Sequence, residues 1–369
     1  MTRRPGPAQR TGNLPVIHMH TRRTFLGTVT AAGAALALRE FDVAAQVAAP
    51  AGAKPHRLDV HQHFLSPGYY ALLNKKNAVA PVPGLAAWKD FTPSRAIEAL
   101  DRIGVATAMV SVTAPGVWFG DVQEARTLAR ELNEYGAAQM AGAHKGRFGL
   151  FAVLPLPDID GSLREIEYAL DTLQADGVGL LTSYGTQWLG DKAFAPVFDE
   201  LNRRRAVVYV HPTDATCCPN LVPGVAAQML EYPTDTTRTI VSLIVGGTAS
   251  RTPNVRFVFS HAGGTLLAVA GRFLGAAADA ATLAKPGAEP DSRLHHLRRF
   301  YYDTAGAANP INMQGLKTLV TTSQIVFGTD TPFFDGAPIV QGLRMVGFSD
   351  VEIRAIERDN AAQFLPKYA

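Results

Sequence analysis

The chain has 369 residues, of which 47% are hydrophobic and 18% are charged. This balance is typical of a globular protein with a large core, and it excludes a disordered or fibrous chain. The first 54 residues hold seven of the 35 Lys and Arg and two of the 32 Asp and Glu. The rest of the chain keeps 28 basic and 30 acidic side chains, a net charge of about −2, so no basic patch predicts nucleic-acid binding.

The N-terminal segment, residues 1–54, has the layout of an export signal. Arg22 and Arg23 precede an apolar, alanine-rich run over residues 28–38, and small residues follow. Paired arginines before such a run are typical of twin-arginine secretion signals. The run is too short to span a bilayer comfortably, which weakens the alternatives of a membrane anchor and a buried helix. We expect cleavage within residues 45–53 and export to the periplasm, with no stable membrane anchor afterwards.

The chain has two cysteines, Cys217 and Cys218, and they are adjacent. A disulfide between neighbouring residues is strained, so two unpaired thiols are the expected state. An exported protein without a disulfide framework fits a route in which folding precedes export. Twin-arginine export is such a route, and it would allow a metal to be loaded in the cytoplasm.

From residue 55 onward, short β-rich runs alternate with longer amphipathic ones. Buried apolar strands separated by helices predict a parallel sheet covered by helices. Eight such units predict an α/β fold, a (β/α)8 TIM barrel, that occupies residues 55–369 as one domain. An open doubly wound sheet is the alternative, but no G-x-G-x-x-G follows the first strand. The expected strands are 57–61, 105–112, 148–154, 177–181, 207–211, 256–261, 300–303 and 324–330.

Helices are predicted between these strands. The first of them follows Thr-Pro-Ser, which is a favourable helix start. Residues 64–91 are rich in Pro, Gly and aromatic residues and are interpreted as an insertion after the first strand. The expected helices are 92–102, 121–144, 161–174, 194–204, 233–249, 264–277, 311–321 and 350–365.

Histidine and aspartate side chains mark the ends of four predicted strands. His61 and His63 end the first strand, His211 the fifth, His261 the sixth and Asp330 the eighth. In a TIM barrel the carboxyl ends of the strands meet at one rim, where the active site is built. His61 and His63 are two residues apart, so in a strand they point the same way, roughly 6–7 Å apart. We therefore expect these five side chains to converge.

Three imidazoles and one carboxylate suit a single divalent metal ion, with zinc most favoured and manganese next. The proposed ligands are His61, His63, His211 and Asp330. No lysine lies near the end of the fourth strand, where residues 180–184 read LLTSY, so a second, carbamate-bridged metal is not expected. His261 is interpreted as a proton shuttle, since imidazole exchanges protons near neutral pH. Asp330 could act as ligand, base, or both in turn.

Four motifs in a fixed order carry a family resemblance. They are D-V-H-x-H-F at residues 59–64, V-H-P-T-D at 210–214, S-H-A-G-G at 260–264 and G-T-D-x-P-F at 328–333. The chain resembles the amidohydrolase superfamily. Within the superfamily it is similar to the branch of 2-amino-3-carboxymuconate-6-semialdehyde decarboxylase and 6-methylsalicylate decarboxylase. The stretch RFGLFAVLPLP at residues 147–157 belongs to the same resemblance, which covers essentially all of the chain after the export signal.

The resemblance implies a metal-dependent decarboxylase that releases CO2 from a hydroxylated aromatic or dienoic carboxylic acid. It implies the four metal ligands given above and a proton-transfer role for His261. It also implies that Arg272 contacts the substrate; in the family this arginine often reaches the site of a neighbouring subunit. It further implies that Phe333 lines the substrate site and that the protein is a homodimer. Where some relatives place a substrate arginine, after the first strand, this chain offers only Lys75, Lys76 and Lys89 as cations.

Two other functions use the same residues. A metal-dependent hydrolase of a lactone, ester or amide would need the same single-metal site. An exported metal-binding protein without activity is a further reading. Two acidic residues near the strand ends, Asp214 and Asp303, are candidates for contacts with the substrate or with the metal ligands.

Overall fold

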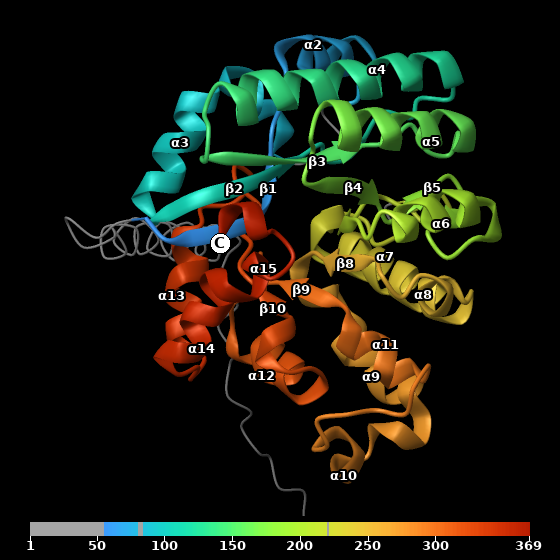
Figure 1. The fold of residues 1–369 in the computed structure, drawn as a ribbon, viewed down its shortest axis with the longest axis vertical. Coiled ribbons are helices and arrows are strands. Elements are labelled where there is room, and N and C mark those ends of the chain that lie inside the picture. The colour runs from blue at the N-terminus through green and yellow to red at the C-terminus, as the bar shows by residue number, and fades with distance from the viewer. Residues whose placement is uncertain (1–54, 80–83, 220) are drawn as a thin grey trace, which may run out of the picture. The chain divides into compact units, whose positions relative to one another are not determined.

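The computed structural model describes residues 55–79, 84–219 and 221–369, so the export signal predicted for residues 1–54 lies outside the described residues. Eight parallel strands form one sheet, and the helices surround it (Figure 1). The strands follow one another in chain order, as in a TIM barrel. In sheet order they are β1 (Arg57–His63), β2 (Val105–Ser111), β3 (Phe148–Val153), β4 (Gly177–Leu181), β7 (Val207–His211), β8 (Arg256–Phe259), β9 (Tyr301–Asp303) and β10 (Ile325–Val326).

The sheet closes because the segment after β10 runs beside β1. The backbone N–H of Asp330 donates to the carbonyl of His61 at 2.8 Å, and that of His63 donates to the carbonyl of Thr331 at 3.0 Å. β10 ends at Val326, and these bonds continue the pairing with β1 beyond it. The predicted (β/α)8 barrel is confirmed, with the last three strands shorter than expected.

The helices begin at residues that the sequence marks as helix starts. Thr92 caps α3, and its side chain accepts a hydrogen bond from the N–H of Arg95. Asp121 caps α4, and Ser349 forms a capping box with Glu352 at the start of α14. The α-helices are α2 (Pro67–Lys75), α3 (Pro93–Arg102), α4 (Val122–Tyr135), α5 (Ile159–Glu167), α6 (Ala195–Arg203), α7 (Ala227–Val245), α8 (Thr248–Arg251), α9 (Leu266–Leu274), α10 (Ala280–Leu283), α11 (Arg293–Arg299), α12 (Pro310–Leu319), α13 (Ala337–Met345), α14 (Asp350–Arg354) and α15 (Asn360–Ala362).

Helix α7 departs most from its prediction, because it begins at Ala227 rather than at Pro233. Proline is most common in the first turn of a helix. In the structure Pro233 lies inside the helix, and its carbonyl accepts hydrogen bonds from the Thr237 hydroxyl and the Thr265 N–H. The six additional residues form the part of α7 that reaches the functional site.

The insertion after β1 contains α2 and a 3-10 helix, η1 (Leu85–Asp90). Its aromatic residue Trp88 is buried and packs against Phe333, with 4.4 Å between ring centroids. Beyond β4, the short strands β5 (Ser183–Tyr184) and β6 (Gln187–Trp188) form a hairpin.

A small apolar cluster fills the barrel, and the C-terminal residues close one of its ends. Phe151 and Tyr209 stack inside this cluster, with ring centroids 5.6 Å apart. Tyr368 belongs to the same cluster, and its hydroxyl donates to Asp176, the residue before β4. The chain end therefore seals the N-terminal ends of the strands and leaves the opposite rim for chemistry.

Cys217 and Cys218 form a disulfide, so the prediction of two unpaired thiols is wrong. They lie in the loop between β7 and α7, where the N–H of Cys218 donates to the carbonyl of Ala215 at 3.0 Å. This tight turn brings the two sulfur atoms together. Strain between neighbouring cysteines favours unpaired thiols, but no feature of the sequence indicated the conformation of this turn.

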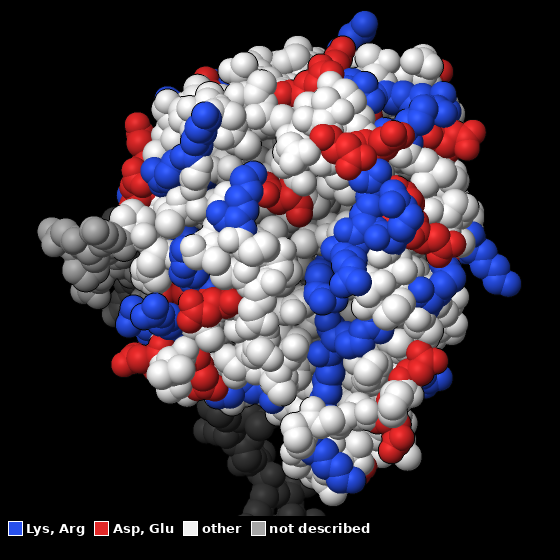
Figure 2. Space-filling model, viewed as in Figure 1, with Lys and Arg blue, Asp and Glu red and all other residues white. Residues whose placement is uncertain are grey.

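On the surface, clustered basic side chains have acidic side chains beside them. Figure 2 shows one face on which Lys and Arg side chains form a band bordered by Asp and Glu. Several arginines of the described residues have acidic partners close by, as Arg204 has in Asp171 at 2.7 Å. No α-helix in the described part of the chain combines the length and the apolar character needed to cross a bilayer.

Candidate metal centre

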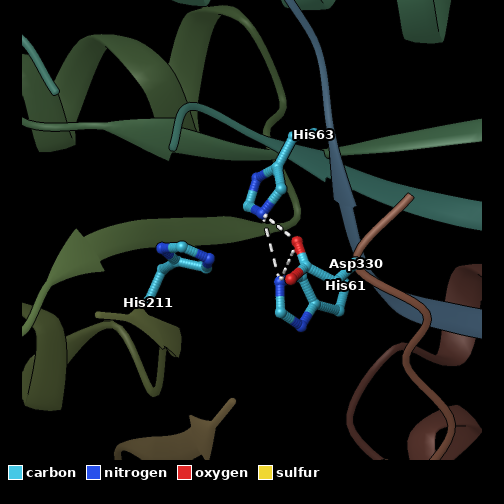
Figure 3. Close-up of side chains that lie close together, drawn as sticks. All are labelled: His61, His63, His211 and Asp330. Carbon is cyan, nitrogen blue, oxygen red and sulfur yellow. Dashed lines mark hydrogen bonds and ion pairs between the residues drawn. The ribbon is translucent and has the colours of Figure 1, made fainter. Parts of the chain in front are cut away.

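Four side chains predicted as metal ligands converge at the C-terminal rim of the barrel (Figure 3). His61 and His63 come from β1, His211 is the last residue of β7, and Asp330 follows β10. One ligand atom from each lies within 4.8 Å of the others. All four residues are buried, with at most 4% of their surface exposed. The convergence expected from the strand ends is therefore observed.

The geometry of this cluster fits a cation. The Nε2 atoms of His61 and His63 lie 3.2 and 3.1 Å from Oδ1 of Asp330, and 3.1 Å from each other. Despite these contacts, Oδ1 is buried and forms no hydrogen bond. Three atoms that can each offer a lone pair, the two Nε2 atoms and Oδ1, thus lie close together around one point. Buried polar atoms in this state call for an unseen partner, and a divalent ion satisfies all of them.

The second nitrogen of each ligand imidazole is engaged by the protein. Nδ1 of His61 contacts Asp303 at 2.8 Å, and Nδ1 of His211 contacts its neighbour's carbonyl, that of Pro212, at 2.9 Å. Nδ1 of His63 lies 3.3 Å from the carbonyl of Ser111. These acceptors hold the proton on Nδ1 and leave the Nε2 lone pair free for a metal.

Asp303 connects the candidate ligands with His261. One carboxylate oxygen accepts from Nδ1 of His61, and the other accepts from the backbone N–H groups of His261 at 2.8 Å and Ala305 at 3.0 Å. The Tyr209 hydroxyl lies 3.4 Å from the first oxygen. Asp303 was only one of two candidates from the sequence, and the structure places it in direct contact with a predicted ligand.

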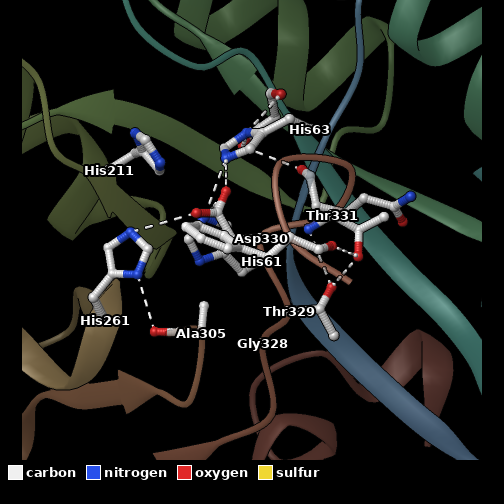
Figure 4. Close-up of polar contacts among 12 residues, drawn as sticks. His61, His63, His211, His261, Ala305, Gly328, Thr329, Asp330 and Thr331 are labelled. Carbon is white, nitrogen blue, oxygen red and sulfur yellow. Dashed lines mark hydrogen bonds and ion pairs between the residues drawn. The ribbon is translucent and has the colours of Figure 1, made fainter. Parts of the chain in front are cut away.

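His261 stands beside the cluster on a short 3-10 turn after β8 (Figure 4). Its Nδ1 bonds the carbonyl of Ala305 at 3.0 Å, and its Nε2 lies 3.7 Å from Oδ2 of Asp330. The side chain is 18% exposed, so solvent reaches it. The turn needs glycine at Gly264, which has a φ of +68° and leaves only 2.0 Å between a Cβ and the carbonyl oxygen of Pro233.

The electrostatics of the cluster favour one added positive charge. Burial lowers the pKa of His61, but the Asp330 and Asp303 carboxylates outweigh it and raise that pKa to about 10. Burial lowers the pKa of His63 and holds that of His211 well below its usual range. In the metal-free protein, His61 therefore stays protonated and supplies the positive charge that a bound metal ion would otherwise provide.

We expect the metal-free protein to lose stability as pH rises from 7 to 10. The pKa of His61 is higher in the folded than in the unfolded state, so its contribution is full below pH 6.5 and disappears as pH rises to about 10. The slope should reach about 1.4 kcal/mol per pH unit. Denaturant melts of the chelator-treated protein would measure it. A metal-loaded sample is the control, in which a neutral His61 removes the slope, and equal slopes in both samples would contradict the assignment.

A cavity of about 520 Å³ opens beside His211, His261 and Asp330. Phe333, which the resemblance assigns to the substrate site, is among its lining residues, and its ring lies 5.8 Å from that of His63. The residues that the sequence did not single out come mainly from the start of α7 and from the loops after β9 and β10. The lining residues are Gly84, Thr113, His211, Gln228, Met229, Tyr232, Pro233, His261, Gly264, Gly306, Ala307, Asn312, Asp330, Phe333 and Phe334.

Arg272 does not belong to this lining. It lies on α9 and is exposed. The lysines of the insertion are also absent from the lining, and Lys76 pairs with Glu124 at 2.8 Å. Asp214 is exposed in the loop after β7, where partial desolvation and then the Glu231 carboxylate raise its pKa.

Asp303→Asn should weaken metal binding by about ten- to a hundredfold. The amide oxygen can keep the two backbone hydrogen bonds, but the amide nitrogen then faces Nδ1 of His61 and drives the proton to Nε2. Metal titration of the purified variant would measure the loss. Asp279→Asn, at the exposed cap of α10, is the matched control. Unchanged metal affinity in Asp303→Asn would show that this contact does not set the tautomer.

Comparisons with known proteins agree with the site. The sequence profile of the amidohydrolase family matches residues 58–367. Decarboxylase yanB of Aspergillus niger is 39% identical over 331 residues, covering 85% of this chain and 88% of its own. The 6-methylsalicylic acid decarboxylase acuB of Aspergillus aculeatus is 35% identical over 337 residues, covering 84% and 96%. The resemblance to this decarboxylase branch is thereby confirmed.

The fold has a close counterpart among solved structures. The dihydroxybenzoic acid decarboxylase of Polaromonas sp. JS666, with bound manganese and 2-nitroresorcinol, superposes with a TM-score of 0.72. The match covers 85% of this chain and 98% of that one at 19% identity. Profile, relatives and fold agree over the same residues, and the chain belongs to the amidohydrolase family.

Proposed function

We propose that the protein is a metal-dependent decarboxylase that releases CO2 from a hydroxylated aromatic carboxylic acid. The observation that carries the proposal is the buried cluster of His61, His63, His211 and Asp330 at the floor of an aromatic-lined cavity. Four relatives that share more than a third of the sequence are named decarboxylases, and two of them are named 6-methylsalicylic acid decarboxylases. A 6-methylsalicylate-like acid is therefore the proposed substrate.

The four clustered residues would hold one divalent ion. Such an ion supplies positive charge that polarises a substrate oxygen. Three imidazoles and a carboxylate suit zinc first and manganese second, and the solved neighbour from Polaromonas contains manganese. Elemental analysis of the purified protein, followed by chelation and re-addition of each ion, would identify the metal.

His261 would deliver the proton that replaces the carboxyl group. When the bond between the ring and the carboxyl carbon breaks, the electron pair stays on the ring carbon and takes a proton. The bond from Nδ1 of His261 to the Ala305 carbonyl turns Nε2 toward Asp330 and the cavity. Nε2 can thus carry a proton at the site and be recharged from solvent. Asp330, besides being a ligand, would hold the protonated imidazole in place.

A hydrolase of a lactone, ester or amide is the alternative function of this site. The two reactions differ in their products. Incubation of the metal-loaded protein with 6-methylsalicylate in ¹⁸O-labelled water should release CO2 and leave a product without ¹⁸O in it. A ring-opened or ester-derived acid that gains ¹⁸O, with no CO2 released from any hydroxybenzoate, would establish the hydrolase instead.

We propose a homodimer in which Arg272 approaches the partner's substrate cavity. The exposure of Arg272 and its absence from the cavity lining of its own chain support an intermolecular role. Sedimentation velocity would give the oligomeric state. If Arg272→Ala raises KM without changing the sedimentation coefficient, the contact is with substrate. A monomeric wild-type protein would overturn the proposal.

We propose export to the periplasm by the twin-arginine route. Arg22 and Arg23 before an apolar run support it. Replacing both arginines with lysine should leave the protein in the cytoplasm of a host that has this pathway, as measured by fractionation. Unaltered distribution of the double variant would refute the route.

A further inference from the structure

The first turns of α7 present two neutral polar side chains to the cavity. Gln228 and Tyr232 are four residues apart, so they lie on the same face of the helix, one turn from each other. Both belong to the lining. The ring of Tyr232 stands at 80° to that of His211, with 6.5 Å between centroids. This pair thus borders the candidate metal centre directly.

The polar atoms of this pair lack partners. Oε1 of Gln228 is buried and accepts no hydrogen bond. Tyr232 is 8% exposed, and its hydroxyl forms no hydrogen bond within the described part of the chain; unlike Oε1 of Gln228, it is not a fully buried unpaired atom and keeps some access to solvent. An unpaired buried polar atom costs about 1–3 kcal/mol. Such a cost is offset when a ligand supplies the missing partner.

The pair offers one donor and one acceptor. A tyrosine hydroxyl carries its proton near neutral pH, so that of Tyr232 can donate. The carboxamide oxygen of Gln228 accepts. No lysine or arginine lines the cavity among the described residues. The chemistry therefore matches a neutral hydroxyl, which accepts and donates at once, better than a second carboxylate.

We propose that Tyr232 and Gln228 bind the ring hydroxyl of the substrate and select hydroxylated aromatic acids over those without the hydroxyl. The proposal rests on the proposed decarboxylase function. Tyr232 donates to the hydroxyl oxygen, and the hydroxyl proton is donated to Gln228. Met229, Phe333 and Phe334 supply apolar surface for the ring beside this polar pair.

The test measures binding as well as turnover. Loss of CO2 from 6-methylsalicylate leaves 3-methylphenol, and toluene is the same ring without the hydroxyl. Calorimetry of the metal-loaded protein should show that 3-methylphenol binds more tightly than toluene. Tyr232→Phe and Gln228→Met should each weaken 3-methylphenol binding by about tenfold and change toluene binding by less than about twofold. The KM for 6-methylsalicylate should rise by a similar factor.

Tyr168→Phe is the matched control. The Tyr168 hydroxyl bonds Glu134 at 2.9 Å in the outer helix layer, away from the cavity, so this variant should bind both probes as the wild type does. Equal changes for both probes, no change for either, or no binding of 3-methylphenol to the wild type would overturn the proposal. If the wild type releases no CO2 from any hydroxybenzoate but its phenol binding depends on both side chains, the decarboxylase function fails and the hydroxyl site stands.

Discussion

His261→Asn should lower kcat for CO2 release by about 10²–10⁴-fold while the protein keeps its metal. Asparagine suits this position for two reasons. The backbone of residue 261 has a φ of +54°, which asparagine tolerates better than most residues. The asparagine amide can also donate to the Ala305 carbonyl in place of Nδ1. The variant therefore keeps the turn but has no group that carries a proton at neutral pH.

The measurement pairs single-turnover CO2 release with metal analysis of the same preparation. His295→Asn, on α11, is the matched control and should behave as the wild type does. A retained metal with slow CO2 release assigns proton delivery to His261 and argues against an inactive metal-binding protein. Full activity in His261→Asn would move proton delivery to another group, with Asp330 the nearest candidate at 3.7 Å.

The predicted part of the site lies where strands end. A TIM barrel brings all strand ends to one rim, so a residue's place along its strand largely determines its place in space. His61, His63 and His211 lie within or at the end of their strands and Asp330 lies four residues after β10, so their convergence follows largely from the topology. The strand boundaries could be off by a residue or two without changing that result.

What the sequence did not predict depends on loops and on a helix start. Gln228 and Tyr232 precede a proline that is a typical helix start, and only tertiary contacts extend α7 past it. The disulfide of Cys217 and Cys218 depends on a turn with no sequence signature. Both cases involve local conformations that the surrounding structure selects, so pattern and propensity could not reveal them.

Asp303 illustrates a third kind of limit. Its position at the end of β9 indicated that it would be near the rim. The hydrogen-bond partners of Asp303 could not be predicted from that position. They depend on how far β9 is shifted along the barrel axis relative to β1, and on the conformation of the turn that contains His261. In the structure, the Asp303 carboxylate contacts both the ring of His61, a candidate ligand, and the backbone N–H of His261, the proposed proton carrier.

Asp330→Asn should abolish stoichiometric metal binding, with affinity reduced at least about a hundredfold, and with it CO2 release. Asp330 is the only acidic member of the four-residue cluster, and its Oδ1 lies within 3.2 Å of both ligand imidazoles of β1. Asparagine keeps the shape and tolerates the positive φ of 63°, so the change is mainly in charge.

The same substitution should alter the protonation of the cluster, which separates a loss of charge from a loss of fold. Asp330 is the first of the two carboxylates that raise the pKa of His61, so in the metal-free variant that pKa should fall from about 10. The stability lost by the metal-free wild type between pH 7 and 10 should therefore be smaller in Asp330→Asn.

Asp335→Asn, exposed in the same loop, is the control and should keep the metal, the activity and the dependence of stability on pH. If Asp330→Asn binds metal as the wild type does, the carboxylate is not a ligand, and the cluster must hold its cation through imidazoles alone.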